Sequence, residues 1–166
     1  MPRPPQIGID PPATSWVVLR ASHRDVPGIV VAVQELLLEL GGAPPAADAL
    51  SETVRELVDD HSAGAVLVAR VDHEVIGVLA ASWQLAIHVP GQYATIQDLW
   101  VHPVWRSRSI GGDLLDALVE LCRGRGIARI EVGLPREGFR ALRATEGFYL
   151  ANDFEPLGPR MRRVIA

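Results

Sequence analysis

The stretch 98–125, DLWVHPVWRSRSIGGDLLDALVELCRGR, decides how this chain folds. It runs from a half-buried strand pattern through an arginine-rich turn into an amphipathic helix pattern. Backbone N–H groups in the first turn of a helix have no partner within the helix, and the helix dipole adds positive charge there. Arg106 and Arg108 bring full charges to the same turn. The stretch therefore predicts a cradle for a pyrophosphate.

The composition favours one globular domain. The chain has 166 residues, of which 48% are hydrophobic and 22% charged, as is ordinary for a domain with a sizeable core. No apolar run approaches the roughly 20 residues of a membrane span. The first residues, MPRPPQIGIDPPATS, are rich in proline and lack the apolar core of a secretory signal. We therefore expect a flexible tail over 1–15, a single domain over 16–166 and a cytoplasmic location.

The single cysteine, Cys122, excludes an internal disulfide and a multi-cysteine metal site. It falls on the apolar stripe of a predicted helix, so we expect a buried structural thiol. His23, His61 and His73 do not have the spacing of metal ligands, and no metal is expected.

Charge is distributed unevenly along the chain. The net charge of −4 argues against a nucleic-acid partner. Residues 106–166 hold 11 of the 16 arginines against 8 carboxylates, and the remainder holds 5 arginines against 12 carboxylates. We therefore expect an anionic ligand to bind the C-terminal part, and a cationic amine to approach the N-terminal part.

Hydrophobic periodicity predicts a mixed α/β sheet with helices on both faces. A short polar link at 72–74 indicates a hairpin. The segment 93–134 is predicted to be a crossover unit that joins two parallel strands. The expected strands are 16–20, 64–71, 75–82, 93–101, 127–134 and 161–165, and the expected helices are 25–40, 46–61, 112–123 and 139–151.

The order of these elements resembles the GCN5-related N-acetyltransferases, or GNAT family. The acyl-CoA motif of that family, Gln/Arg-x-x-Gly-x-Gly/Ala, follows an aspartate-leucine strand and a proline. Here Asp98-Leu99 and Pro103 precede Arg106-Ser107-Arg108-Ser109-Ile110-Gly111. Arg106, Ile110 and Gly111 match the motif, whereas Ser107 and Ser109 stand where glycine is usual.

A second match lies near the C-terminus. The family often shows Phe-Tyr-x-x-x-Gly-Phe, and this chain has Phe148-Tyr149 followed by Asp153-Phe154, with Asp153 in the place of the glycine. The resemblance covers about 16–166. It implies the GNAT acyl-CoA N-acyltransferase fold, and an acetyl-CoA-dependent N-acetyltransferase that acylates a primary amine of a small molecule or peptide directly, in a ternary complex.

The resemblance also implies which residues bind acetyl-CoA, the acyl donor. Backbone amides of the turn, about 108–113, would hold the pyrophosphate. Backbone groups near the end of strand 93–101, beside a separating strand 127–134, would align the pantetheine arm and thioester. If the position of Ser109 requires a positive φ, serine is strained there where glycine is not. The cofactor-binding set is Leu99, Trp100, Val101, Arg106, Ser107, Arg108, Ser109, Ile110, Gly111, Gly112 and Asp113.

Tyr149 is the candidate general acid, since a phenol can protonate a leaving thiolate. The alternative is an aromatic side chain that only packs between helix and sheet.

Asp98 is the candidate general base, although it could instead cap a loop or pair with an arginine. Strand alternation would place Gln97, which cannot accept a proton, on the opposite face from Asp98. His88 and His102 could contribute, or could be solvated loop histidines.

Trp83, His88 and Tyr93 are candidates for lining the acceptor site. Many family members form dimers, so a homodimer is one of the possible assemblies. No membrane or nucleic-acid partner is expected.

Two other functions compete with the acetyltransferase. Ser107, Ser109, Gln97 and Asp153 all depart from the family pattern, so the chain could be a degenerate GNAT-fold module that binds acyl-CoA with little or no turnover. A nucleotide-phosphate binder of another fold has little support, because the chain has neither a P-loop lysine nor a Gly-x-Gly-x-x-Gly fingerprint.

Overall fold

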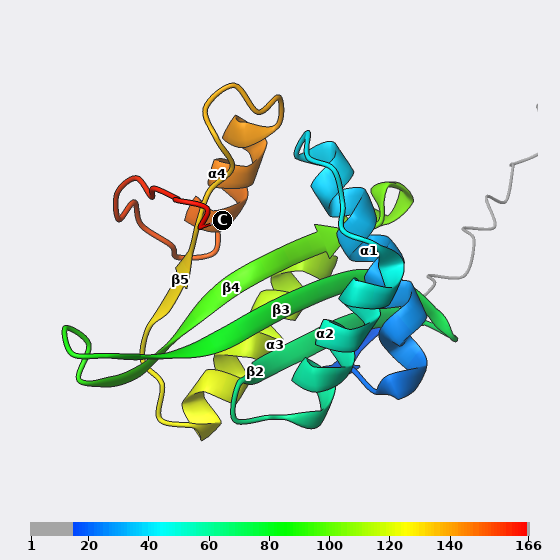
Figure 1. Cartoon of the computed structure of the whole chain (residues 1–166), viewed down its shortest axis with the longest axis horizontal. Helices are drawn as coiled ribbons and strands as arrows, with labels where there is room; N and C mark the ends of the chain where they lie inside the picture. Colours follow the sequence, from blue (N-terminus) through cyan, green and yellow to red (C-terminus); the bar gives the residue numbers. More distant parts are fainter. Residues whose placement is uncertain (1–14, 166) are drawn as a thin grey trace, which may run out of the picture.

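A computed structural model describes residues 15–165, arranged around a five-stranded sheet in the order β1-β2-β3-β4-β5 (Figure 1). The expected tail over 1–15 falls, apart from its last residue, outside the described residues. The strands are β1 Val17–Arg20, β2 Gly64–Val71, β3 Glu74–Ala86, β4 Gly91–Val101 and β5 Ile130–Val132. The helices are α1 Val26–Glu39, α2 Ala47–Asp59, α3 Ile110–Gly124 and α4 Leu142–Leu150, with short 3-10 helices η1 His23–Asp25 and η2 Pro103–Trp105.

The first four strands form an antiparallel meander, and α3 carries the chain across to β5, which pairs with β4 in parallel. Asp72 and His73 make the tight connection between β2 and β3, as the sequence predicts. β2 is buried along nearly its whole length, as its continuous apolar pattern requires of a strand covered on both faces. The expected mixed sheet and crossover unit are confirmed.

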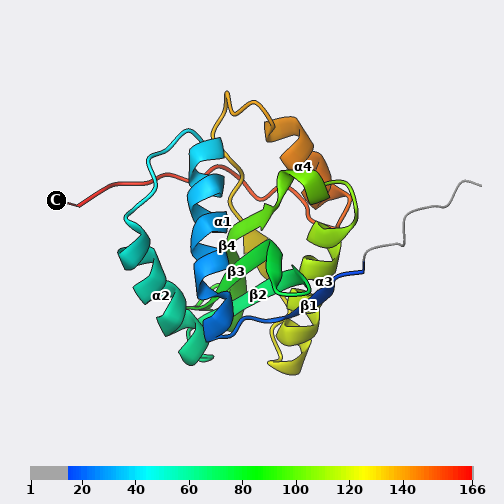
Figure 2. The same ribbon diagram turned by 90° about the vertical axis from the view of Figure 1, so that its right-hand side faces the viewer.

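Helices cover both faces of the sheet, as expected. Figure 2 shows α1 and α2 on one side and α3 on the other. The α1/α2 face has a core that includes Ile29, Val68 and Trp100. The core of the α3 face includes Leu79 and Leu114. Cys122 is buried in that second core, and burial raises the pKa of its thiol, so it is the inert structural thiol that its position predicts.

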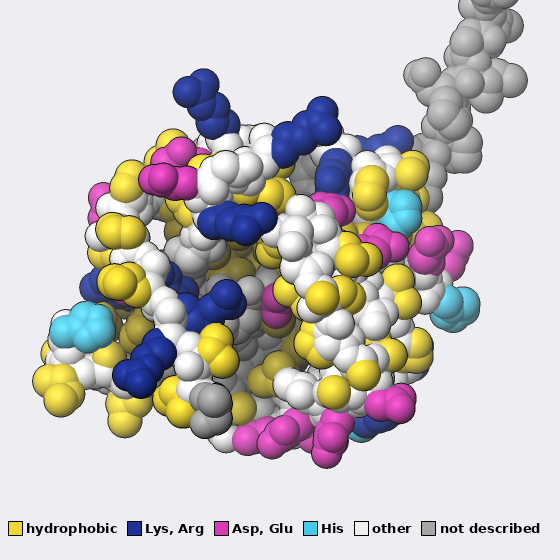
Figure 3. Space-filling view, turned by 45° about the horizontal axis from the view of Figure 1, so that its top comes forward, with side chains coloured by type: hydrophobic (Ala, Val, Ile, Leu, Met, Phe, Trp, Pro, Cys, Tyr) yellow, Lys and Arg dark blue, Asp and Glu magenta, His cyan; other side chains and the backbone are white. Residues whose placement is uncertain are grey.

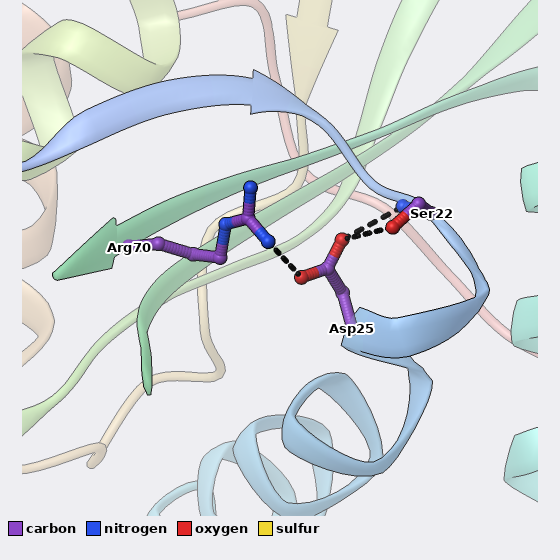
Figure 4. A network of polar contacts seen from close by, with 3 residues as sticks. All are labelled: Ser22, Asp25 and Arg70. Atoms are coloured by element: carbon purple, nitrogen blue, oxygen red, sulfur yellow. Dashed lines mark hydrogen bonds and ion pairs between the residues drawn. The ribbon is translucent and has the colours of Figure 1, made fainter. Parts of the chain in front are cut away.

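A buried ion pair fixes the start of α1 against the sheet (Figure 4). Nη1 of Arg70, on β2, lies 3.1 Å from Oδ1 of Asp25, and both side chains are more than nine-tenths buried. The other carboxylate oxygen of Asp25 accepts hydrogen bonds from the backbone N–H and the hydroxyl of Ser22, at 2.8 and 2.9 Å. Removing either charge would leave the other buried and unpaired, which is strongly destabilising. The pair thus anchors the helix whose far end reaches the candidate site.

The prediction of a final strand over 161–165 is wrong. These residues have no strand structure, and Met161, Val164 and Ile165 are almost fully exposed. Pro156 and Pro159 fix φ and remove two N–H donors just before the segment. The neighbouring sheet edge, β5, is only three residues long, shorter than the expected 127–134, so it offers little to pair with.

Among the described residues, no helix combines the length and apolar character needed to cross a membrane.

Candidate active site

The site begins where β4 and β5 separate. The two strands pair at only three positions, and the last pair is Ile96 with Val132. β4 continues to Val101 paired with β3 alone. Its edge beyond Ile96 therefore has no strand partner on the β5 side, which leaves backbone groups available to an extended ligand. The separation of these two strands, expected from the family resemblance, is present.

A β-bulge in β4 sets the direction of the side chains at this opening. Ala81 pairs with Ile96 and Ala80 with Asp98, so Gln97 is the additional residue. Nε2 of Gln97 donates to Oγ of Ser82 at 2.9 Å. Ser82 and Ala80 are two residues apart on β3 and so share a face. The prediction that Gln97 and Asp98 point to opposite faces is therefore wrong, because a bulge breaks the alternation on which it depended.

Asp98 is half-buried and has no ion pair or side-chain hydrogen bond within residues 15–165. Burial raises the pKa of its carboxyl group, because the charged form loses solvation. The two structural roles considered for Asp98, a loop cap and an arginine partner, therefore find no support among the described residues. A carboxylate with a raised pKa binds a proton more tightly than an ordinary one, as a general base requires.

The turn between η2 and α3 presents a row of free backbone donors. The first helical hydrogen bond runs from the N–H of Asp113 to the carbonyl of Ser109 at 2.9 Å. Within the described part of the chain, the N–H groups from 107 to 112 have no hydrogen-bond acceptor. Ser107 and Ser109 adopt left-handed conformations, with φ of 62° and 70°, which curves successive N–H groups towards one point. This geometry suits a phosphate group at a helix N-terminus.

Two members of the predicted cradle are used within the protein. The N–H of Asp113 is inside α3, and its carboxylate accepts the indole N–H of Trp16 at 2.8 Å. Nε of Arg106 donates to the carbonyl of Val101 at 2.9 Å, and Nη2 pairs with Glu39 at 2.6 Å. The free amides thus span 107–112, one residue earlier than about 108–113, and Arg106 connects the turn to β4 and to the end of α1.

The remaining cradle residues mostly pack. Leu99 and Val101 contact the α3 core, and Ile110 is fully buried. The guanidinium of Arg108 lies 5.1 Å above the ring of Trp105 and makes no ion pair with a described residue. Trp100 is buried against α1, and its indole N–H has no partner among the described residues. The predicted role of Trp100 can therefore involve only its backbone.

Helix α4 places Tyr149 beside the cradle. A Cβ added to Gly111, in the first turn of α3, would lie 3.0 Å from two ring carbons of Phe148. Tyr149 follows on the helix, and its ring lies 5.2 Å from that of Phe148 and 5.1 Å from that of Phe154. Burial raises the pKa of Tyr149 to about 12, so the phenol stays protonated at neutral pH. It can act as a hydrogen-bond donor there, but not as a base.

The acceptor-side residues divide between the two faces. Tyr93 pairs with Gln84, two residues from Ser82 on β3, and its ring lies 6.0 Å from that of His88. Trp83 faces the other way: its indole N–H donates to the carbonyl of His61 at 3.1 Å, and Arg125 covers its ring at 5.0 Å. The structure groups His88 with Tyr93 and separates Trp83 from them.

Sequence reasoning missed two polar residues on the face of Tyr93. Oγ of Ser82 accepts a hydrogen bond from Gln84 as well as from Gln97. The two residues are Ser82 and Gln84. No motif includes them, and only the alternation of β3 could have indicated their face. Figure 3 shows a hollow between the α1/α2 side and the side of α4 and the C-terminal segment. A separate cavity of about 490 Å³ lies between α1, the β2–β3 turn and His102, away from the cradle turn.

The sequence profile of the acetyltransferase (GNAT) family matches residues 32–149. The chain belongs to the GNAT family. This match covers β4, the cradle turn and α4 through Tyr149. No curated protein matches the chain.

Solved structures support the GNAT fold. A possible acetyltransferase from Clostridium difficile 630 superposes with a TM-score of 0.76 at 18% identity, covering 91% of this chain and 98% of that one. Aminoglycoside 6'-N-acetyltransferase AAC(6')-Ih from Acinetobacter baumannii gives 0.73 at 14% identity, with coverage of 92% and 100%. An aminoglycoside acetyltransferase from an uncultured soil metagenomic sample, in complex with sisomicin, gives 0.71 at 17% identity, with coverage of 91% and 97%.

All three positions where this GNAT chain replaces a glycine of the family pattern have a positive φ. The values are 62° at Ser107, 70° at Ser109 and 65° at Asp153. Among the described residues, Asp72 in the β2–β3 turn is the one other non-glycine with a positive φ. The backbone thus keeps the left-handed conformations that glycine favours and accepts the strain of a Cβ at each.

Proposed function

We propose that this GNAT protein is an acetyl-CoA-dependent N-acetyltransferase that acylates a primary amine of a small molecule or peptide by direct transfer in a ternary complex. The observation that carries the proposal is the nest of free N–H groups over 107–112, at the end of the unpaired edge of β4. Acetyl-CoA fits this donor set, because a pyrophosphate needs several convergent N–H groups and an extended amide-containing arm can pair with a strand edge.

Acetyl-CoA supplies an activated acyl group as a thioester. The amides from 107 to 112 would hold the diphosphate, and the free edge of β4 would orient the chain that follows it. The bulge at Gln97 turns Asp98 towards the acceptor face. Asp98 takes a proton from the incoming ammonium, which leaves the nitrogen lone pair free to form the C–N bond.

Tyr149 stabilises the leaving thiolate. Its pKa, raised to about 12 by burial, lies well above the roughly 8.5 of a thiol, so complete proton transfer to sulfur is unfavourable in isolation. We therefore assign Tyr149 the donation of a hydrogen bond to the sulfur as the C–S bond breaks. In this role Tyr149 would stabilise the charge that develops on sulfur until a proton from solvent neutralises it.

Thiol release and product mass, measured with acetyl-CoA and an amine library, test the proposal. Tyr149→Phe should lower kcat by about 10-fold or more while barely changing acetyl-CoA affinity. Asp98→Asn should lower turnover by about 100-fold or more, whereas Asp116→Asn, an exposed carboxylate on α3, should leave it unchanged. Unchanged turnover in Tyr149→Phe would remove that residue from the mechanism.

A further inference from the structure

The side chain of Arg160 lies against the backbone at Gly133, closer than a residue with a Cβ would comfortably allow. A Cβ added to Gly133 would lie 3.0 Å from Nη1 and 3.4 Å from Cδ of Arg160. The guanidinium and its stem therefore lie directly on the backbone that follows β5. A side chain at position 133 would require this exposed arginine to shift by a few tenths of an ångström, so the glycine allows the close approach of the charge to the backbone.

The register of β5, extended by one residue to Gly133, indicates that Arg160 lies on the acceptor face. Val132 pairs with Ile96, and both contact the α3 core, whereas Glu131 pairs with Thr95 and faces the other way. Gly133 lies one residue past the end of β5. If the alternation of the strand continues by that one residue, its absent side chain points to the face of Glu131. That is the α1/α2 face, which also carries Asp98. In Figure 3, arginine side chains (dark blue) lie along the α4 side of the hollow.

Arg160 makes no ion pair with any residue from 15 to 165. Glu131, the carboxylate on β5, is paired with Arg129 at 2.8 Å. The free guanidinium sits just past the last β4–β5 pair, and Asp98 sits just past the same pair on β4. The opening between the strands is thus bordered by a cation on one side and a proton acceptor on the other.

We propose that the acceptor is an amine that also carries a carboxylate, an amino acid or amino-acid-like compound, with its carboxylate on Arg160 and its amine at Asp98. The inference rests on the N-acetyltransferase function proposed above. A guanidinium binds a carboxylate through two parallel N–H groups, and Ser82, Gln84 and Gln97 add neutral hydrogen-bonding groups nearby. A polycationic amine would instead bring additional positive charges towards Arg160.

The test is a comparison of matched acceptors. The twenty common amino acids, their carboxamides and a set of aminoglycosides are each assayed for thiol release and acetylated product. The preferred amino acid should exceed its carboxamide by about 10-fold or more in kcat/KM. Arg160→Ala should abolish that preference, mainly through KM, and leave the carboxamide rate unchanged. Arg160→Lys should retain part of the preference for the amino acid over its carboxamide. Arg162→Ala, which changes another exposed arginine two residues away, should retain all of it.

Gly133→Ala is an independent variant that keeps the arginine and moves it, and it should also reduce the preference. Equal rates for acid and carboxamide, a better rate with an aminoglycoside, or a preference that survives Arg160→Ala would each overturn the inference. If no amine of any kind is acetylated, the proposed function itself fails. Calorimetric titration of the CoA-saturated protein with the same amino acids and carboxamides then decides the inference: Arg160-dependent binding of the acids supports it, and its absence overturns it.

Discussion

Ser109 adopts a left-handed backbone conformation, which a glycine would adopt more easily than a serine. With φ of 70° and ψ of 4°, it begins α3 in the left-handed region. Such a conformation costs a residue with a Cβ about 1–2 kcal/mol. Ser109→Gly should therefore raise the free energy of unfolding by up to about 1 kcal/mol, since the greater entropy of unfolded glycine offsets part of the relief. Chemical denaturation measures this change.

The same substitution should change CoA affinity by less than about threefold, because the free amides of the nest already exist with serine in place. Ser109→Ala is the control, since it keeps the Cβ and removes only the hydroxyl. A tenfold or larger gain in affinity in Ser109→Gly, but not in Ser109→Ala, would mean that the native cradle is impaired by its serine.

Asp98 should reduce stability at neutral pH. Burial raises its folded-state pKa above the unfolded value, so the folded protein binds the proton more tightly. The protonated carboxyl is tolerated in the fold, so there is no penalty below the unfolded pKa of about 3.9. The free energy of unfolding then falls as pH rises through the folded pKa and the buried group becomes charged. Asp98→Asn should therefore stabilise the protein by about 1 kcal/mol at pH 8, with a gain that shrinks towards pH 4. Denaturation across this range measures the change.

For this pH-dependent gain, Asp116→Asn provides the matched control, because that carboxylate is exposed and its removal should give no pH-dependent gain. A variant of Asp98 that is less stable than the wild type at pH 8 would indicate that the charged carboxylate has a partner in the folded protein.

The sequence offered candidate residues at this scale, but not their orientation. Asp98 and Tyr149 are candidates through their place in motifs, and the serines through their departure from one; their roles stay predictions. The bulge at Gln97 left no sign in the sequence, so strand alternation assigned it the wrong face. Arg160, proposed above to bind the acceptor carboxylate, was not a sequence candidate, because its contact with Gly133 joins segments that a linear pattern does not bring together.

At the scale of elements, the contact between α3 and α4 holds Tyr149 beside the nest. Gly111 lets the Phe148 ring approach the first turn of α3. Gly111→Ala should cost about 1–3 kcal/mol of stability, because a Cβ would overpack this contact. It should also lower kcat as α4 moves. Unfolding and steady-state kinetics on the same preparation measure both effects.

Phe148→Leu in the Gly111→Ala background should recover part of both losses, since a smaller side chain makes room for the added methyl group. Gly124→Ala offers a control at the other end of α3, where a Cβ meets no atom within 4 Å. If Gly111→Ala is as stable and active as the wild type, the α3–α4 contact does not position Tyr149.

The helices were predictable because each buries one periodic face, and the central strands because continuous apolar runs suit strands covered on both faces. The observed bounds differ from the expected ones by a few residues. The final strand was not. Its β-branched residues suit a strand, but pairing depends on a partner edge, and β5 is only three residues long. Trp83 was grouped with the acceptor site from its place in the chain, whereas its face depends on the register of β3 against β4.

At the scale of the whole molecule, the chain beyond Arg160 should contribute little to stability. Met161, Val164 and Ile165 are exposed and outside the sheet. A protein that ends after Arg160 should lose less than about 1 kcal/mol of stability and keep its acceptor preference. Thermal unfolding and the matched-acceptor assay measure these outcomes. A loss of several kcal/mol would indicate that the segment packs against something, such as a second copy of the chain.

The architecture brings one end of α1 to the site that β4, α3 and α4 assemble. Arg70 and Asp25 anchor the start of α1 against the sheet, and Glu39 at its end pairs with Arg106 of the cradle turn. The C-terminal segment adds Arg160 at the separation of β4 from β5. The proposed site therefore depends on segments from the whole described chain, joined by contacts that no single motif encodes.

The most direct test of the proposed acetyltransferase function follows the acetyl group itself. Wild-type protein is incubated with acetyl-CoA and the amine panel, and mass spectrometry measures acetylated amine while a thiol reagent measures released CoA. We predict equal amounts of the two products, with both reduced together in Tyr149→Phe and Asp98→Asn. Tight binding of acetyl-CoA with no acetylated product from any amine would contradict the account and identify the protein as an acyl-CoA-binding module.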